Sequence, residues 1–254
     1  MLKYSGCRER GILIVTGNLT VSGSYKWDGI VLVGGTMTSN GAILSGRGRG
    51  VPPRPSSFLP PERAMTLQHT KVLIFAGPLY EDLELWYPKI RLEEEGARTV
   101  VAGTGERTYQ GKRGYPLTVD ANVDDLSADD FDGLVIPGGY APDIMRRSKK
   151  LLQLTREIYE ADKPVAFICH AGWVPISAGI VRGKRGTSVG AIKDDLVNAG
   201  LLWEDSPVVV DGNLISSRTP ADLPQFMRAL ILALAARPVD AGTGAGAAAP
   251  AGRR

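Results

Sequence analysis

Residues 164–179 decide the fold prediction, and they read PVAFICHAGWVPISAG. The first five are typical of a short buried strand, and the segment after His170 has the character of a helix. Cys169 therefore falls at a sharp turn between a strand and a helix. Free N–H groups and the helix dipole favour a thiolate at such a helix start. We expect Cys169 to be a reactive nucleophile, although an inert, buried cysteine fits the same apolar surroundings.

Cysteine and histidine are scarce in this chain, which contains two of each. Cys7 and His69 lie in a segment of different character, so cysteine–histidine chemistry points to Cys169 and His170. Two cysteines and two histidines give no recognised spacing of metal ligands. Gly138-Gly139 lacks the Gly-x-x-Gly continuation of a dinucleotide-binding loop. We therefore expect no metal and no other cofactor.

From Lys71 to Arg237 the chain alternates between strand and helix patterns. The expected elements lie at 71–76, 83–95, 98–102, 132–137, 151–161, 164–168 and 194–199, followed by a hairpin at 207–217 and a last helix at 223–236. Thr219 to Asp222 has the capping pattern of that helix. Repeated β-α units predict a mostly parallel sheet covered on both faces. The turns at Glu81, Gly138–Asp143 and Cys169 should then meet at its carboxyl edge, where ligands bind in such sheets.

Seven ordered blocks carry a family resemblance. They are Lys71–Phe75, Tyr80–Leu85, Pro137–Asp143, Pro164–His170, Thr187-Ser188, Ile192–Asp195 and Val208–Arg218. Together they resemble the DJ-1/PfpI superfamily, and most closely its PfpI-type branch of cysteine peptidases and glyoxalase III or deglycase-like enzymes. The resemblance implies an α/β, flavodoxin-like fold with helices on both faces of the sheet. It also implies a cofactor-free cysteine hydrolase or lyase that acts on small carbonyl or acyl substrates.

The same resemblance implies roles for residues around the cysteine. It makes Cys169 the nucleophile and places oxyanion-binding N–H groups at Gly138, Gly139 and Ala171. Taken alone, two glycines after a strand indicate a plain tight turn equally well. The family block puts an acidic residue at Glu81, close enough to share a proton with the cysteine. A carboxyl group facing a thiolate in a poorly hydrated niche should have a raised pKa.

Two acidic positions have alternative interpretations. Glu81 stands at the start of a helix, where the dipole favours a carboxylate, so ordinary capping also explains it. In PfpI-like enzymes an acidic residue from a neighbouring subunit orients the histidine after the cysteine, and the matching position here is Asp143. Many relatives have the longer glutamate there, and Asp143 fits an N-cap equally well. Contact between Cys169 and His170 does not follow from adjacency alone.

Residues 1–65 differ in character from the rest of the chain. Runs at 11–23 and 29–41 are rich in β-formers and separated by Gly and Asn, as in β-solenoids or hairpin arrays. Residues 46–61 indicate a linker, and residues 238–254 indicate a disordered tail. Two or three rungs bury no core by themselves. We expect residues 1–65 to be an appendage, a fusion scar or the product of a start upstream of Met65, and 66–237 to be the DJ-1/PfpI-like domain.

The composition is that of an ordinary globular protein, with 43% hydrophobic and 22% charged residues among 254. A net charge of +3 gives no basic footprint for nucleic acid. No apolar run approaches the roughly 18 residues of a membrane span, and the N-terminus lacks a signal-peptide layout. A lone functional thiol suits a reducing compartment. We expect a cytoplasmic homo-oligomer, a dimer, trimer or hexamer, that takes a small carbonyl or peptide substrate and binds neither nucleic acid nor membrane.

Several reactions remain open for such a protein. Peptide hydrolysis, rearrangement of a 2-oxoaldehyde such as methylglyoxal, and release of early glycation adducts all need an activated thiol and an oxyanion site. Glutamine amidotransferases of this fold use a distant histidine after the nucleophile, and none follows His170. Isocyanide hydratases usually lack a histidine beside the cysteine. The alternative is a non-enzymatic redox-sensing or stress-protective protein in which Cys169 is oxidised.

Overall fold

The computed structural model describes residues 66–237 in full and the secondary structure of residues 8–15, 19–22, 26–33 and 37–40. The chain divides into two compact units, Met1–Glu62 and Arg63–Arg254. The expected linker at 46–61 and the expected tail at 238–254 lie outside the described residues.

The larger unit is built around a seven-stranded sheet with the strand order β14-β15-β11-β10-β5-β6-β9. The strands are β5 (Lys71–Phe75), β6 (Arg98–Gly103), β9 (Ala121–Asn122), β10 (Gly133–Ile136), β11 (Val165–Ile168), β14 (Val208–Asp211) and β15 (Leu214–Ser217). All neighbours run parallel except β14 and β15, which form the expected antiparallel hairpin. The prediction of a mostly parallel, flavodoxin-like α/β fold is therefore confirmed.

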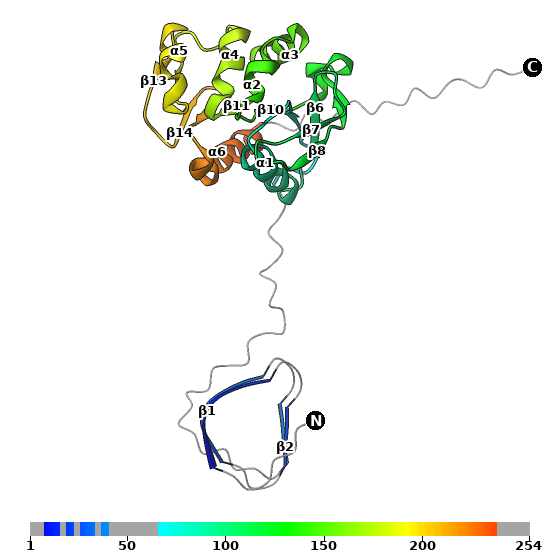
Figure 1. Cartoon of the computed structure of the whole chain (residues 1–254), viewed down its shortest axis with the longest axis vertical. Coiled ribbons are helices and arrows are strands. Elements are labelled where there is room, and N and C mark those ends of the chain that lie inside the picture. The colour runs from blue at the N-terminus through cyan, green and yellow to red at the C-terminus, as the bar shows by residue number, and fades with distance from the viewer. Residues whose placement is uncertain (1–7, 16–18, 23–25, 34–36, 41–65, 238–254) are drawn as a thin grey trace, which may run out of the picture. The chain divides into compact units, whose positions relative to one another are not determined.

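Helices cover both faces of this sheet (Figure 1). One face carries α1 (Asp82–Glu94) and α6 (Leu223–Ala235), which contact each other. The other carries α2 (Ala141–Met145), α3 (Lys149–Glu160) and α4 (Trp173–Ala178), and α5 (Lys193–Asn198) packs beside α4. Short 3-10 helices are η1 (Val123–Asp125), η2 (Ala128–Asp130), η3 (Cys169–Gly172), η4 (Gly190–Ile192) and η5 (Pro220–Asp222). Among the helices described, none is both long and apolar enough to cross a membrane.

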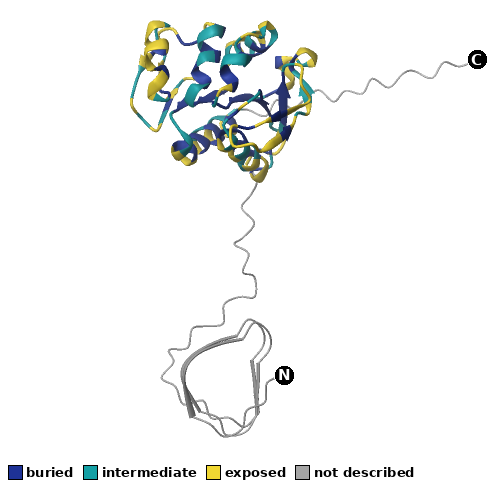
Figure 2. Ribbon diagram, viewed as in Figure 1, coloured by how far each residue is buried: buried dark blue, intermediate teal, exposed yellow. Residues whose placement is uncertain are grey.

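The sequence explains these elements locally. Every residue of β10 and β11 is buried, as expected for parallel strands covered on both faces (Figure 2). The apolar face of α3 is buried, and Ser148 caps this helix by accepting a hydrogen bond from the Leu151 N–H at 3.2 Å. Helix α1 ends before Gly96, whose φ of +90° suits the left-handed turn that closes a helix.

Three local features differ from the prediction. Thr219 precedes η5 rather than α6, and Asp222 is the N-cap residue of α6, because the proline after Thr219 starts a short 3-10 turn first. The sequence pattern did not reveal the antiparallel pair β7 (Thr108–Gln110) and β8 (Pro116–Thr118). It also did not reveal the parallel pair β12 (Arg185–Gly186) and β13 (Leu202–Trp203). Strands of two or three residues are too short for a hydrophobic period to be visible.

The N-terminal unit contains the expected β-rich runs as four strands. They are β1 (Arg8–Val15), β2 (Leu19–Ser22), β3 (Lys26–Val33) and β4 (Met37–Asn40). β1 pairs with β3 and β2 pairs with β4, both in parallel. Parallel pairing corresponds to the solenoid interpretation of these runs and not to the hairpin interpretation, since hairpin strands are antiparallel.

Candidate active site

The turns after β5, β10 and β11 meet at the carboxyl edge of the sheet, as the sequence predicted. Backbone hydrogen bonds join the first two turns, from the Glu81 N–H to the Gly138 carbonyl at 3.1 Å and from the Tyr140 N–H to the Leu79 carbonyl at 2.9 Å. A Cβ built on Gly138 would lie 2.8 Å from the Cys169 Cβ, so the cysteine stands beside this junction. The edge thus brings one thiol and several carboxylates into a small volume.

Cys169 occupies the sharp turn that follows β11, as the first residue of η3. Its φ is +63°, in the left-handed region that residues with a side chain seldom adopt. Such a conformation costs about 1–2 kcal/mol and is held in place only by the surrounding structure. The strand before the turn is wholly buried, and the cysteine itself is half-buried. The turn therefore projects the sulfur from the sheet edge.

His170 contacts the sulfur directly, which adjacency alone did not establish. Its Nδ1 lies 3.3 Å from Cys169 Sγ, within hydrogen-bond distance for a thiol. The ring also makes an edge contact with Trp173, with 5.5 Å between the ring centroids. Burial lowers the pKa of His170, and the positive charge of Lys112 lowers it further. The imidazole is therefore held neutral, the form that can accept a proton.

Glu84 is the carboxyl group beside the cysteine. It lies in the first turn of α1, is completely buried, and accepts a hydrogen bond from the Gly138 N–H to its Oε2 at 2.8 Å. Within the described part of the chain its Oε1 has no nitrogen or oxygen partner. Burial raises the pKa of Glu84 to about 7, and the charge of Glu81 acts in the same direction. The carboxyl group can thus hold or release a proton near neutral pH.

The sequence predicted Glu81 at this position, and the structure places Glu84 there instead. Glu81 is the N-cap residue of α1 without a side-chain capping bond, and its Oε2 lies 3.4 Å from Lys112 Nζ. The signal that could have found Glu84 is helical spacing. Glu84 shares the buried face of α1 with Pro88 and Leu92, four and eight residues further on. A carboxylate on an apolar helix face is the unusual feature of this block.

The expectation of a low pKa for Cys169 is also wrong. Burial raises the pKa of its thiol to about 12, and the negative charge of Glu84 is the next cause. The N–H groups of His170 and Gly139 act in the opposite direction, as expected at a helix start, but they are outweighed. Two acids this close share their protons. Between the two pKa values the Cys169–Glu84 pair therefore holds one proton and one negative charge, and the thiolate forms when Glu84 takes that proton.

The expected oxyanion groups are only partly available. The N–H of Gly138 is donated to Glu84, so it holds the acid in place. The N–H of Gly139 faces the sulfur instead. The φ of Gly139 is +79°, a backbone conformation that favours glycine. Ala171 is buried two residues beyond the cysteine in η3, and its part in an oxyanion site stays a prediction.

Asp143 lies in the first turn of α2 and forms an ion pair with Arg147 one turn later. The N-cap residue of α2 is Tyr140, so the capping interpretation of Asp143 is wrong. Among the contacts of the described residues none joins Asp143 to His170 of the same subunit. The structure of a single chain therefore leaves this acid outside the Cys169 site.

A hairpin that the sequence did not reveal closes one side of the site. The Asp82 carboxylate accepts hydrogen bonds from the backbone N–H groups of Arg113 at 2.8 Å and Tyr115 at 3.2 Å, both in the turn between β7 and β8. The N–H of Lys112, the residue just before Arg113, donates to the Tyr80 carbonyl at 2.7 Å. Asp82 thereby fixes the backbone of the turn that carries Lys112, whose ammonium group lies near Glu81. The sequence could not indicate this contact, because thirty residues separate Glu81 and Lys112.

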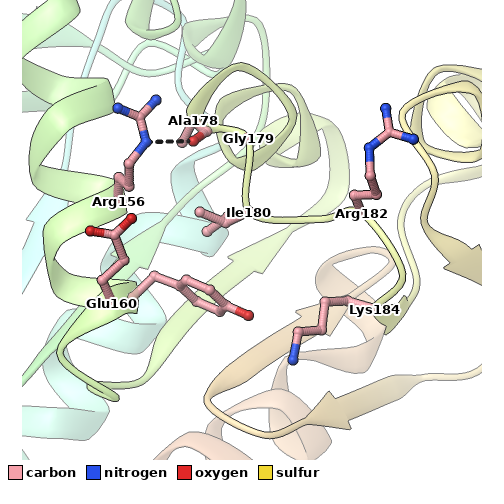
Figure 3. Close-up of a pocket in the computed structure, with 8 residues that line it drawn as sticks. Arg156, Glu160, Ala178, Gly179, Ile180, Arg182 and Lys184 are labelled. Atoms are coloured by element: carbon pink, nitrogen blue, oxygen red, sulfur yellow. Dashed lines mark hydrogen bonds between the residues drawn. The ribbon is translucent and has the colours of Figure 1, made fainter.

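A separate cavity of about 230 Å³ lies between α3 and the segment that follows α4 (Figure 3). Arg156, Arg182 and Lys184 line it, and Arg156 Nε donates to the Ala178 carbonyl at 3.0 Å. None of its lining residues belongs to the Cys169 site. The residues described contain no group of three or more His, Cys, Asp and Glu side chains placed to hold a metal ion.

Comparison with known proteins gives consistent matches to this unit. The model of the DJ-1/PfpI family matches residues 70–233. "Deglycase PYRAB04690" of Pyrococcus abyssi is 46% identical over 161 residues, which are 63% of this chain and 97% of that protein. "Protein/nucleic acid deglycase 2" of Escherichia coli is 35% identical over 169 residues, 65% of this chain and 98% of that protein. A crystal structure from Anabaena variabilis with DJ-1/ThiJ/PfpI-like and ferritin-like domains has a TM-score of 0.63 and 40% identity, over 65% of this chain and 48% of that one.

Glu84→Gln should reveal the buried acid through the pH dependence of stability. The unfolded chain ionises Glu84 near 4.5, whereas the folded chain holds the proton up to about 7. Wild type should therefore lose up to about 3 kcal/mol of unfolding free energy relative to the variant as pH rises through this interval. Urea unfolding of both proteins at pH 4.5 and pH 8 measures the change, with Glu81→Gln as the matched control. An equal difference between wild type and Glu84→Gln at both pH values would contradict the raised pKa.

Gly138→Ala should destabilise the protein. The new Cβ would lie 2.6 Å from Glu84 Oε2 and 3.0 Å from the His170 backbone nitrogen, so the junction has to open. We expect a loss of about 1–3 kcal/mol in unfolding free energy. Gly190→Ala is the control, because nothing lies within 4 Å of a Cβ at Gly190. Equal stability of the two variants in urea unfolding would show that Gly138 is not tightly enclosed.

Proposed function

Because the chain belongs to the DJ-1/PfpI family, we propose that it is a cysteine-dependent enzyme of the glyoxalase or deglycase type. Its substrates would be small 2-oxoaldehydes and the early adducts that they form with amines and thiols. The observation that carries the proposal is the Cys169–Glu84 pair, a nucleophile beside a buried carboxyl group whose pKa is about 7. Relatives named deglycases support the same reaction class.

The first step is addition of the sulfur to the aldehyde carbon. Glu84 takes the proton of Cys169, and the sulfur electron pair forms the S–C1 bond while the C=O π electrons move to oxygen. That oxygen then takes the proton back from Glu84, which gives a hemithioacetal. The N–H groups of Gly139 and His170, which face the sulfur, are suited to stabilise the developing negative charge.

The second step moves hydrogen from C1 to C2. The Glu84 carboxylate removes the C1 proton to give an enediolate. The proton of the C1 hydroxyl passes to the C2 oxygen and Glu84 returns its proton to C2, so that a thioester of a 2-hydroxy acid results. Water then cleaves the thioester, with the neutral His170 placed to accept a proton from it. C1 is oxidised as C2 is reduced, so the sum is 2-oxoaldehyde plus water to 2-hydroxy acid and no other oxidant enters. A carboxyl group with a pKa near 7 suits both proton transfers.

Early adducts would be processed by the same site. An amine or thiol that has added to the aldehyde leaves with one proton and regenerates the 2-oxoaldehyde, which Cys169 then consumes. Peptide hydrolysis would use the same thiol, but it has no need for a carboxyl group that exchanges protons with a substrate carbon. Oxidative sensing, the alternative, would use the same sulfur and would also need the proton of Cys169 to pass to Glu84, because susceptibility to oxidation follows thiolate character.

Methylglyoxal should be converted to lactate by the wild-type chain and not by Cys169→Ala. We expect a loss of at least about 100-fold in kcat/KM for Cys169→Ala and for Glu84→Gln, since each removes a group needed for chemistry. Wild-type activity should rise with pH, and the midpoint of this rise should lie near 7, where Glu84 loses its proton. Cys7→Ser, which changes the other cysteine, is the matched control. Unchanged lactate formation by Cys169→Ala, or cleavage of a peptide substrate alone, would overturn the proposal.

We further propose that the active unit is a homo-oligomer in which Asp143 of a second subunit orients His170. The Nδ1 atom of His170 faces the sulfur, which leaves Nε2 for an acidic partner. Two exposed apolar side chains flank this edge, Leu79 at 49% and Tyr140 at 56% exposure, and apolar surface of this kind is typical of a subunit contact. The shorter Asp143 would have to leave Arg147 to reach the imidazole.

Mixing two inactive variants should restore part of the activity if the acid acts between subunits. The Cys169→Ala chain lacks the thiol, and the Asp143→Ala chain lacks the acid. A contact between the two chains contains one intact Cys169–His170 pair that faces one intact Asp143. Random pairing should return up to about a quarter of wild-type activity, with subunit exchange confirmed by mass spectrometry. Confirmed exchange without recovered activity would show that Asp143 serves only its ion pair with Arg147.

A further inference from the structure

The strands of the N-terminal unit repeat with a single spacing. β1 pairs with β3 so that Arg8 lies beside Lys26, and β2 pairs with β4 so that Leu19 lies beside Met37. Both offsets are 18 residues, since 26 − 8 and 37 − 19 give the same number. The unit is therefore two successive turns of a parallel β-solenoid with one period.

The sequence of one turn is similar to that of the next at this spacing. Identical residues occupy paired positions at Gly11 and Gly29, Ile12 and Ile30, Val15 and Val33, and Thr20 and Thr38. The intervening pairs Leu13 with Val31 and Ile14 with Leu32 conserve apolar character. The two turns thus share four identical residues among twelve paired positions, and the same pairing can form between turns of different copies.

Among the described strands of this unit, those at each end of the short stack have one edge without a described partner. Within the ranges 8–15, 19–22, 26–33 and 37–40, each strand pairs with one other strand only. An unpaired edge offers a row of N–H and C=O groups to another strand. Solenoids of this kind become stable with about three or more turns, because each turn is stabilised by its neighbours.

We propose that the N-terminal unit is an assembly module that stacks end to end on a second copy of this chain. β3 and β4 of one copy would pair in parallel with β1 and β2 of the next, and the 18-residue register would continue across the contact. The second copy is the occupant because the required interface already exists inside each chain, between its own two turns. Such a head-to-tail contact does not close on itself, so it adds copies in a row.

Cysteine cross-linking in the full chain tests the register directly. In a background with Cys7→Ser and Cys169→Ala, one chain carries Thr20→Cys and a second carries Thr38→Cys. Across the proposed contact these positions lie about 4.8 Å apart, within the Cα separation of a disulfide. In the matched control, Ser22→Cys replaces Thr20→Cys. The two cysteines are then two residues out of register, about 8 Å apart and beyond the reach of a disulfide.

We expect the Thr20→Cys and Thr38→Cys mixture to form a disulfide-linked dimer under mild oxidation, at least about 5-fold faster than the off-register mixture, since only the first pair meets disulfide geometry. A single chain with both substitutions pairs the same two strands internally. It therefore reports whether positions 20 and 38 accept a disulfide. Arg10→Cys with Asp28→Cys gives a second in-register pair on β1 and β3. Equal rates for in-register and off-register mixtures, self-linking of either single variant, or no link between chains would each overturn the proposal.

Discussion

The hydrogen bond from the Gly138 N–H to Glu84 Oε2 is the contact on which the rest of the site depends. It is buried, 2.8 Å long, and joins the turn after β10 to the first turn of α1. The residue at 138 has to be glycine because a Cβ would collide with the carboxylate and with the cysteine. A charged side chain is stable in such a place only with a partner. This bond holds the Glu84 carboxyl group in the site, beside Cys169.

The surrounding structure places the reacting groups around this bond. Backbone pairing between the turns after β5 and β10 sets where α1 begins, and with it the position of Glu84 in the first turn of that helix. The strained turn at Cys169 presents the sulfur from the third strand. Asp82 anchors the β7–β8 turn over the same edge and so positions Lys112. Four separate segments of the chain therefore contribute one group each to a site that no local sequence contains.

The sequence predicted the fold well because its signals are local. Buried strands appear as continuous apolar runs, and the Asp211-Gly212-Asn213 turn marks the final hairpin. The meeting of three turns followed from parallel topology, as did the position of Cys169. The choice between Glu81 and Glu84 did not follow, because it depends on which face of α1 packs inward. The pKa of Cys169 was missed because burial and a neighbouring carboxylate outweigh the helix start.

The left-handed backbone at Cys169 sets function against stability at that one position. A glycine there would relax a conformation that costs a cysteine about 1–2 kcal/mol, but it would remove the nucleophile. Under the proposed function, the substitution that would relax this turn would therefore also remove the reacting group. The strain of this turn and the thiol of the proposed chemistry thus reside in one residue.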